Sequence, residues 1–403
     1  MKSSSWLFNV TVRASSLSAD RCPRLVPVPG RGNAKALVPP SCPRTLDLRP
    51  VLEPLLAAER AIAGSAAVVR RLPRPDLIIR GLERREAVLS SQTEGTRTDL
   101  TQLLEYEATG SAEGMPDDAA VTLGYVRALD LGLGVVRRSG GRDHLTLDLI
   151  QQMHSVLMAG SAYPYPEGPG AWRQAQVWIG GRRIEDATLI PPPVSHLELC
   201  LRDLEDFLRF DPSPVTTMPV SMRMAVAHVQ FEAIHPFGDG NGRVGRLLPP
   251  LMMAAEGLPP LYLAGYLKAH QRRYYDGLAG VQLRGRWADW LAFFLEGVAV
   301  AAATEQATGA RLLAIRQDWQ ARAAHLRADS AARRLLDGLL GAPVQTLASV
   351  RAALGVSAQA ANAGIGVLLG LGVLREVSGR RWGRRFQAWE VLGVLEGGVS
   401  DGS

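Results

Sequence analysis

The sequence predicts a mostly helical protein, all-α apart from a few short strands. Of its 403 residues, 47% are apolar and 6% are aromatic, and Ala, Leu, Val and Arg are abundant. Apolar side chains recur at the spacing of one helix face through most of the chain, as in Leu52, Leu55 and Leu56. Strand-like patterns occur around residues 177–190 and 373–391. We therefore expect packed helices with two small β elements.

The composition limits the classes of function. A formal net charge of +6 permits binding of nucleotides or nucleic acid but does not argue for either. Cys22, Cys42 and Cys200 are too few and too scattered for a disulfide framework or a zinc site, so we expect a cytoplasmic protein. The best membrane candidate, residues 291–303, is short and contains Glu296, so we expect no membrane partner.

Changes in composition divide the chain into four regions. Residues 1–43 are rich in Ser, Pro and Gly with almost no acid, and we expect a disordered extension there. Helical patterning then predicts an N-terminal helical segment over 44–112 and a helical core over 113–310. An Ala- and Arg-rich helix at 310–330 leads to a C-terminal module over 320–395. The expected core helices span 119–133, 147–158, 197–210, 218–234, 262–275 and 277–303.

One loop, residues 235–246, concentrates the chemistry between two apolar segments that predict helices. Its sequence is HPFGDGNGRVGR. Glycines at 238, 240 and 242 allow positive φ and an anion-binding concavity of backbone N–H groups at the start of the following helix. Arg243 and Arg246 can fork onto phosphate oxygens. Asp239 suits Mg²⁺ that is also bound by phosphates, and His235 suits proton abstraction near neutral pH.

The same residues resemble the signature H-P-F-x-D-G-N-G-R-x-x-R of the Fic (filamentation induced by cyclic AMP) family at every fixed position. The resemblance implies a protein adenylyltransferase, a nucleotidyltransferase that moves AMP from ATP to a Ser, Thr or Tyr hydroxyl of a target protein. It assigns deprotonation of that hydroxyl to His235 and Mg²⁺ binding to Asp239. The backbone of Gly240, Asn241 and Gly242 would form the anion hole, Arg243 would contact phosphate, Arg246 would hold the γ-phosphate, and Phe237 would anchor the loop.

A second motif lies about 140 residues earlier, at Ser90-x-x-x-Glu94-Gly95. By itself it is an ordinary helix end with Gly95 as the cap. It also resembles the inhibitory helix motif [S/T]-x-x-x-E-[G/N] of the Fic family. A glutamate here can pair with Arg246, so that ATP binds unproductively and the protein is self-inhibited in cis.

Residues 176–190 predict a short β-hairpin around a Gly-Gly turn. It resembles the Fic flap, whose edge strand aligns a target segment by β-augmentation, and backbone groups near Ile179 and Gly180 would lie beside the nucleotide. Tyr274 and Gln282 match positions that face adenine or ribose in some family members, although adjacent tyrosines are also typical of a core. His270 stands where many relatives have Asn, which leaves adenine selectivity open.

The C-terminal module reads as helices at 331–340, 347–354 and 357–371, then strands at 373–377 and 385–391 joined by a basic loop. This order predicts a winged helix-turn-helix. Its partner would be DNA or another protein, including a second copy in a homodimer, because the Ala- and Gly-rich recognition helix offers little for reading bases.

Three alternatives stay open at this stage. The site could run in reverse, with Glu94 positioning a water that removes AMP from a modified target. It could use another nucleotide, because the loop reads phosphates more than bases. The chain could also be a DNA-binding regulator that senses ATP. Two further features are expected to be structural: a packed His228, and a kink at Pro249 and Pro250.

Overall fold

The computed structural model describes residues 17–71, 74–111, 113, 115–139, 141–212, 218–379 and 382–397. These fall into two compact units. The first unit contains the described residues up to Ala66, Thr93–Gly95 and Gly124–Ala302. The second contains the described residues of Ala67–Gln92, Thr96–Leu123 and the chain from Ala303 onward. Four helices have residues in both units: α1 (Leu52–Arg71), α2 (Pro75–Thr93), α4 (Ala119–Ser139) and α11 (Trp287–Arg322).

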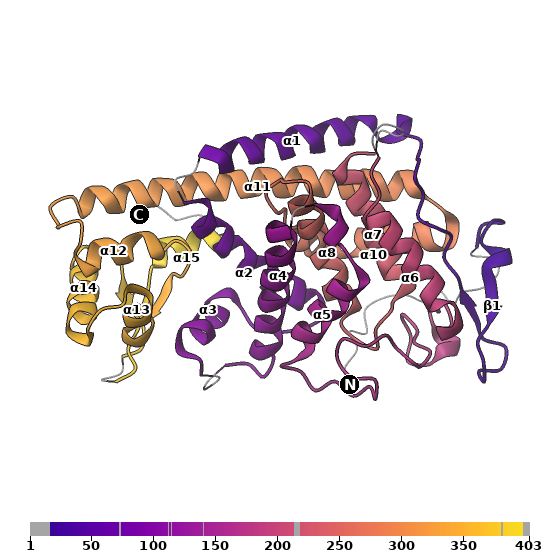
Figure 1. The fold of residues 1–403 in the computed structure, drawn as a ribbon, viewed down its shortest axis with the longest axis horizontal. Coiled ribbons are helices and arrows are strands. Elements are labelled where there is room, and N and C mark those ends of the chain that lie inside the picture. Colours follow the sequence, from indigo (N-terminus) through magenta and orange to yellow (C-terminus); the bar gives the residue numbers. More distant parts are fainter. Residues whose placement is uncertain are drawn as a thin grey trace. The chain divides into compact units, whose positions relative to one another are not determined.

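The first unit is built around α7 (Val220–Ile234), whose residues are all buried. Its neighbours α6 (Val194–Leu208), α8 (Asn241–Ala255) and α10 (Gln271–Arg284) pack against it (Figure 1). Because α7 is surrounded, its polar side chains need internal partners. Ser221 donates to Glu59, for example, and Gln230 donates to the Pro40 carbonyl. The unit is completed by α5 (Leu147–Met158) and α9 (Ala264–Ala269).

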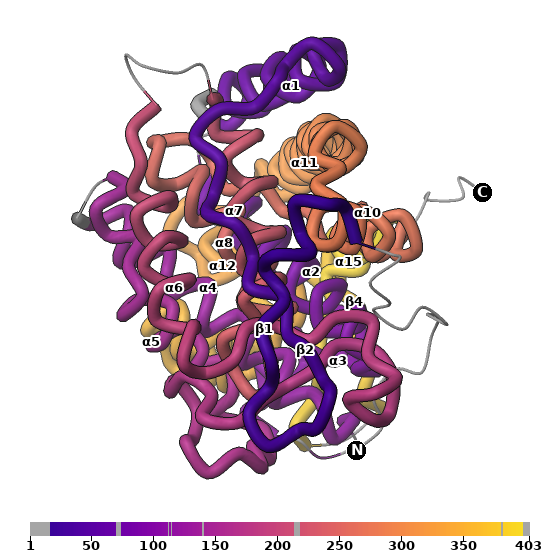
Figure 2. The backbone as a smooth tube through the Cα atoms, turned by 90° about the vertical axis from the view of Figure 1, so that its right-hand side faces the viewer, coloured from indigo at the N-terminus to yellow at the C-terminus, as the bar shows by residue number. Residues whose placement is uncertain are grey.

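The prediction of a disordered extension is wrong for residues 17–43, and the residues before them lie outside the described part of the chain. Strands β1 (Leu25–Pro27) and β2 (Lys35–Leu37) form an antiparallel pair (Figure 2). Ala36 is fully buried and Leu37 is nearly so, because both pack against the segment around Ile184–Ile190. The buried Arg21 donates to the Val281 and Gln282 carbonyls and caps the end of α10. A few apolar side chains and one cap thus order a segment whose composition predicts disorder.

The predicted flap hairpin is reduced to one antiparallel bridge, between Ile179 and Leu189. Gly180 and Gly181 both have positive φ, and a short 3-10 turn at Ile184–Asp186 follows them. Prolines 191–193 have no N–H to donate, so a strand ladder does not continue past Ile190.

Several helix boundaries differ from the predicted ones. Gly277, the expected start of a helix, lies inside α10, which ends at Arg284 and is capped by Gly285 with φ +64. The next helix, α11, runs without a break to Arg322 and includes the start of the segment that we expected to link domains. Pro249 and Pro250 do not interrupt α8. Helix α1 ends at Arg71 and α2 begins at Pro75, where a proline is tolerated because the first N–H groups of a helix have no partner within it.

The second unit contains a three-stranded antiparallel sheet in the order β3-β5-β4. The three predicted helices and two predicted strands of the C-terminal module are present, but the strand at Val344–Thr346 was not predicted. The strand expected over 385–391 ends at Gln387, and a helix that was not predicted begins at Trp389. The winged-helix assignment stays a prediction. Arg380 and Arg381 of the basic loop lie outside the described residues. The elements of this unit are α3 (Leu100–Thr109), α12 (Ala331–Gly338), β3 (Val344–Thr346), α13 (Leu347–Leu354), α14 (Ala358–Gly370), β4 (Arg375–Glu376), β5 (Arg385–Gln387) and α15 (Trp389–Leu395).

By length and composition alone, two described helices are apolar enough to cross a membrane, Ala119–Arg138 and Trp287–Arg322, or up to three if the bent pair α13–α14 is counted as one span. The expectation that no segment reaches this length was therefore wrong. In the fold, 61% and 50% of the apolar windows of the two single helices are buried, so packing accounts for much of their composition.

We predict that Gly124→Ala destabilises the protein. A Cβ at Gly124 would overlap the Leu157 carbonyl where α4 meets α5, and relief of such overpacking costs about 1–3 kcal/mol. Gly134 on the same helix is the matched control, because a Cβ there meets only the flexible Arg138 side chain. Chemical denaturation should show a lower free energy of unfolding for Gly124→Ala and a gain of up to about 1 kcal/mol for Gly134→Ala. Equal effects of the two changes would contradict the close α4–α5 packing.

Candidate functional site

His235 ends α7 in a left-handed backbone conformation, with φ 51 and ψ 61. It is the one non-glycine residue with positive φ among those described. Such a conformation costs on the order of 1–3 kcal/mol and persists only where its surroundings enforce it. The N–H of His235 donates to the Phe231 carbonyl at 2.9 Å and closes the helix. The turn sends the chain directly into the Gly-rich loop.

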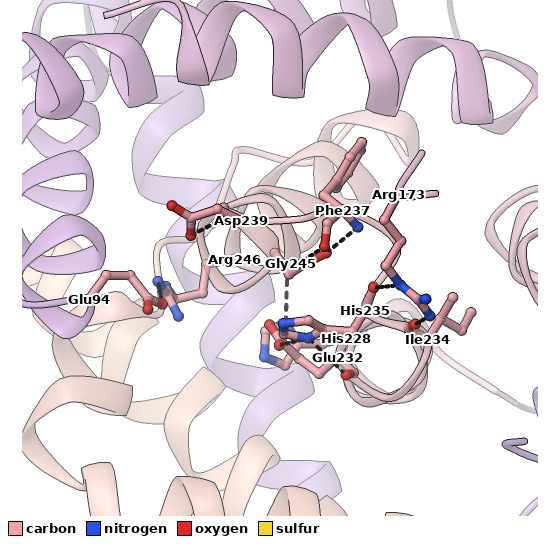
Figure 3. A network of polar contacts seen from close by, with 12 residues as sticks. Glu94, Arg173, His228, Glu232, Ile234, His235, Phe237, Asp239, Gly245 and Arg246 are labelled. Carbon is pink, nitrogen blue, oxygen red and sulfur yellow. Dashed lines mark hydrogen bonds and ion pairs between the residues drawn. The ribbon is translucent and has the colours of Figure 1, made fainter. Parts of the chain in front are cut away.

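Arg173 holds the backbone of His235 in this left-handed conformation. It is 1% exposed, and its guanidinium donates to the carbonyls of His235 at 2.8 Å and Pro192 at 2.6 Å. Its own N–H donates to the Pro236 carbonyl at 2.9 Å. Burial lowers the pKa of Arg173 to about 10, which still leaves it charged at neutral pH. This buried cation therefore joins Pro192, just after the flap segment (residues 176–190), to the turn at His235, and its contact with His235 is drawn in Figure 3.

The loop itself is held from inside by Asn241 and from behind by His154. The Asn241 side chain accepts from the Phe237 N–H and donates to the Phe237 carbonyl, both at 2.9 Å. His154 stacks on Phe237 with ring centroids 3.7 Å apart. Because His154 Nδ1 accepts from the Gly170 N–H, its Nε2 must carry the proton that it donates to the Asp239 carbonyl. Burial lowers the pKa of His154 to about 4, consistent with this neutral form.

The loop delivers charged side chains to the start of α8. Gly240, with φ +81, is the N-cap, and the free N–H groups of the first turn make this a positive helix end. Arg243 is 6% exposed, and its Nη2 lies 3.8 Å from an Asp239 carboxylate oxygen. The buried Nε of Arg243 has no hydrogen-bond partner in the described part of the chain. An unsatisfied guanidinium donor at a helix start is suited to an anionic ligand.

Glu94 lies at this helix start and pairs with Arg246. Arg246 Nη2 donates to Glu94 Oε1 at 2.6 Å (Figure 3), and a Cβ on Gly242 would overlap the same carboxylate oxygen. Partial desolvation raises the pKa of Glu94, but the Arg246 guanidinium outweighs it and leaves the pKa below its usual value. The ion pair is therefore fully present at pH values above the ordinary carboxyl pKa. It is lost only when the pH falls through the lowered pKa of Glu94. The carboxylate stands where an anionic ligand of Arg246 would bind.

The motif around Glu94 behaves locally as a helix end. Ser90 is buried within α2, which ends at Thr93, and Gly95 has φ +93. The predicted glycine cap is thus confirmed. The left-handed Gly95 turns the chain away after placing Glu94.

His235 is suited to act as a base through Nε2. Its Nδ1 lies 3.4 Å from the Glu232 carbonyl, which favours the tautomer with the proton on Nδ1. Nε2 has no hydrogen bond with the described residues, and the side chain keeps 22% of its exposure. Burial, reinforced by Arg173, lowers the pKa of His235 to about 4. At neutral pH the imidazole is therefore unprotonated and open to a hydroxyl.

His228 is packed, as predicted, and it serves α8. Pro249 has no N–H for the Gly245 carbonyl four residues earlier, and His228 Nδ1 donates to that carbonyl at 2.9 Å instead. Nε2 must then accept from the Tyr274 hydroxyl at 2.8 Å. Tyr274 is 1% exposed, so its hydroxyl is used in the core. A nucleotide contact by Tyr274 stays a prediction.

The remaining nucleotide candidates lie on the flap segment and on α10. Ile179 exchanges backbone hydrogen bonds with Leu189, and Gly180 is exposed. Gln282 is half-buried, and its carbonyl accepts from Arg21. The structure thus brings His235, Asp239, Arg243, Arg246 and Glu94 to one helix junction.

Arg173, Glu232 and His154 were not assigned to the site from the sequence. Arg173 follows a Gly-Pro-Gly stretch far from the loop, and a buried guanidinium that bonds only carbonyls leaves no charge pattern to read. Glu232 has a signal, because it is the one acidic residue in the helix before the loop and lies three positions before His235.

Comparisons with known proteins agree with this geometry. The Fic/DOC family N-terminal model matches residues 52–134, and the Fic/DOC family model matches residues 144–253. The protein adenylyltransferase Fic of Culex quinquefasciatus is 32% identical over 136 residues, and fic-1 of Caenorhabditis elegans is 35% identical over 136 residues. These matches cover 34% of this chain and 24% of each relative.

Solved structures support the fold. A Fic family protein from Desulfovibrio desulfuricans G20 matches 86% of this chain and 97% of its own, with a TM-score of 0.51 at 20% identity. A Fic domain containing signaling protein from Bacteroides thetaiotaomicron VPI-5482 matches 63% of this chain and 95% of its own, with a TM-score of 0.51 at 16% identity. The chain is a member of the Fic/DOC family, with a mostly helical Fic fold and a distant, partial relationship to the Fic protein adenylyltransferases.

Proposed function

We propose that this protein transfers AMP from ATP to a hydroxyl side chain of a target protein. The observation that carries the proposal is the junction of α7 and α8. There a neutral imidazole with an open Nε2 adjoins a positive helix start that holds two buried arginines. This combination suits a base acting beside a polyphosphate. The relatives that match part of the chain are named protein adenylyltransferases.

The chemistry follows from the positions of the side chains. His235 Nε2 accepts the proton of the target hydroxyl, whose oxygen forms a bond to the α-phosphorus as the bond to the β-phosphate oxygen breaks. Pyrophosphate leaves. Arg243, whose buried Nε lacks a partner among the described residues, donates to the phosphates. Catalysis of this kind depends on positioning and on neutralising charge.

Asp239 is the residue that would hold Mg²⁺. Its side chain keeps 58% of its exposure, and one oxygen accepts from the Gly240 N–H at 2.6 Å. No cluster of three or more metal-ligating side chains is found among the described residues, which fits an ion bound by one carboxylate together with substrate phosphates. When bound, the ion neutralises charge on those phosphates.

Glu94 would restrain this reaction. Its carboxylate occupies Arg246 and lies against Gly242 at the start of α8. A terminal phosphate of ATP needs the same guanidinium, so the two anions compete. The wild-type protein would therefore bind ATP with its phosphates poorly aligned for attack.

The first functional prediction is that Glu94→Gly increases transfer of label from α-labelled ATP to protein by at least about tenfold, because it frees Arg246 for the nucleotide. His235→Ala in the same background should abolish the label. Glu113→Gly, which removes an exposed glutamate from a turn, is the matched control and should behave as wild type.

The outcomes separate the alternatives. Label that persists without His235 would remove it as the base. If no variant is labelled but labelled guanosine, uridine or cytidine triphosphate is used, the nucleotide is different. If AMP is instead released from a modified target protein, and this release requires Glu94, then the site runs in reverse.

A second prediction concerns Arg173. Arg173→Met removes hydrogen bonds to the His235 and Pro192 carbonyls, which leaves buried carbonyls unsatisfied at about 1–3 kcal/mol each. We expect a lower unfolding midpoint, and in the Glu94→Gly background a fall in kcat that exceeds any change in KM for ATP. The exposed Arg183, changed to Met, is the control. Full activity of folded Arg173→Met would show that the turn at His235 does not need this support.

A further inference from the structure

Glu232 is a buried acidic residue behind the base. It lies three residues before His235 on α7, and its side chain is 9% exposed. Its Oε2 lies 3.9 Å from His235 Nδ1, on the side of the ring opposite the open Nε2. Its Oε1 has no hydrogen-bond partner among the described residues. The oxygen without a partner faces Gly245, and Oε2 is the one beside His235. The carboxylate therefore acts on His235 through its charge rather than through a hydrogen bond.

The structure makes room for this carboxyl. A Cβ on Gly245 would lie 2.5 Å from Glu232 Oε1, so a residue with a side chain at position 245 would displace it. Gly245 separates Arg243 and Arg246 on α8, and here its missing side chain lets a carboxyl approach the helix. Glu232 thus lies between the base and α8.

We propose that Glu232 is a positioning residue for the base: its carbonyl accepts the Nδ1–H of His235, and its carboxylate, 3.9 Å from Nδ1, stabilises the imidazolium that forms when Nε2 takes the proton of the target hydroxyl. This inference rests on the proposed function of the site. The proton moves from the hydroxyl oxygen to Nε2, the imidazolium that forms is neutralised by Glu232, and the proton then leaves to water at the exposed edge of the ring. No other reactant is needed.

The need for such a partner follows from the electrostatics of His235. Its pKa of about 4 makes it a weak base, and a carboxylate at Nδ1 strengthens an imidazole base by stabilising its protonated form. Burial raises the pKa of Glu232 to about 7. The positive charge of Arg246 opposes this rise, and the negative charge of Glu94 adds to it. Glu232 is therefore poised between its neutral and ionised forms near neutral pH.

Glu94 enters the same balance. Its negative charge opposes ionisation of Glu232, so withdrawal of Glu94 from Arg246 favours the Glu232 carboxylate. Movement of Glu94 away from Arg246 would therefore both free the guanidinium and make His235 a stronger base. The charged and titratable groups that act on Glu232 or His235 are Arg246 on α8, Glu94 after α2, Tyr274 and Tyr275 on α10, Asp239 in the loop, and Arg173.

The test compares Glu94→Gly with Glu94→Gly/Glu232→Gln, in which the side chain keeps its shape but cannot ionise. We expect kcat to fall by about tenfold or more with little change in KM for ATP, and the acidic limb of the kcat profile to move to lower pH. Glu94→Gly/Glu232→Asp should recover part of the lost kcat and move the acidic limb part of the way back toward its position in Glu94→Gly. Glu256→Gln, which removes a half-buried carboxylate that pairs with Arg142 and Arg223, is the structural control and should leave the profile in place.

An NMR titration of the histidine rings provides a readout that does not need activity, with the His235 signals assigned from His235→Ala. In the Glu94→Gly protein the His235 ring signals should shift as Glu232 ionises near neutral pH, and Glu232→Gln should remove this step. Absence of the step from the Glu94→Gly protein would overturn the proposal. A raised KM for ATP at constant kcat in the Glu232→Gln variant would also overturn it, because Glu232 would then act on nucleotide binding through Arg246. Absence of transfer in all variants would instead count against the proposed function alone.

Discussion

His235 can keep its left-handed backbone because a single buried guanidinium bonds the carbonyls around it. Arg173 reaches the His235 and Pro192 carbonyls with its side chain and the Pro236 carbonyl with its own N–H. A lysine would offer one point of charge where these carbonyls need a fork. The direction in which the chain leaves α7, and therefore the place of the imidazole relative to the Gly-rich loop, depends on this one side chain. The backbone strain is confined to His235, whereas the hydrogen bonds that maintain it come from Arg173, more than sixty residues earlier in the chain.

On the α8 side of the site, the Gly245 carbonyl lacks its usual helical hydrogen bond because residue 249 is a proline. Pro249 deprives the Gly245 carbonyl of its helical donor, and His228 replaces it from the neighbouring helix, completed by the Tyr274 hydroxyl. This hydrogen bond ties α8 to α7 between the base and Arg246. The absence of a side chain at Gly245 then lets Glu232 lie between the helices. The two prolines, which suggest a broken helix, are thus tolerated in a helix whose unpaired carbonyl has a partner.

The sequence predicted the parts of the site that are local along the chain. The loop from His235 to Arg246 and the helix end at Glu94 are each specified by a few adjacent residues with definite backbone and charge requirements. What it missed depends on contacts between distant segments. Arg173 bonds carbonyls, which every residue has, and so leaves no complementary pattern. The ordering of residues 17–43 comes from Ala36, Leu37 and Arg21 meeting the flap segment and α10. The flap was overpredicted because Val-Trp-Ile followed by Gly-Gly satisfies hairpin chemistry, whereas the prolines at 191–193 prevent a longer ladder.

The charges around Arg246 explain why one displacement can have two effects. In the structure the guanidinium lies near two carboxyls, and only one of them, Glu94, pairs with it directly at 2.6 Å. Burial raises the pKa of Glu232, the Arg246 charge opposes this rise, and the negative charge of Glu94 adds to it, so the more exposed Glu94 holds the negative charge. An anionic ligand that displaces Glu94 moves its carboxylate toward water, where it no longer opposes Glu232. Ligand phosphates would bring negative charge back to Arg246, whereas the Glu232 carboxyl lies beside His235, with Oε2 3.9 Å from Nδ1. The position of each carboxyl relative to the base, rather than the total charge, therefore decides whether the imidazole gains a partner.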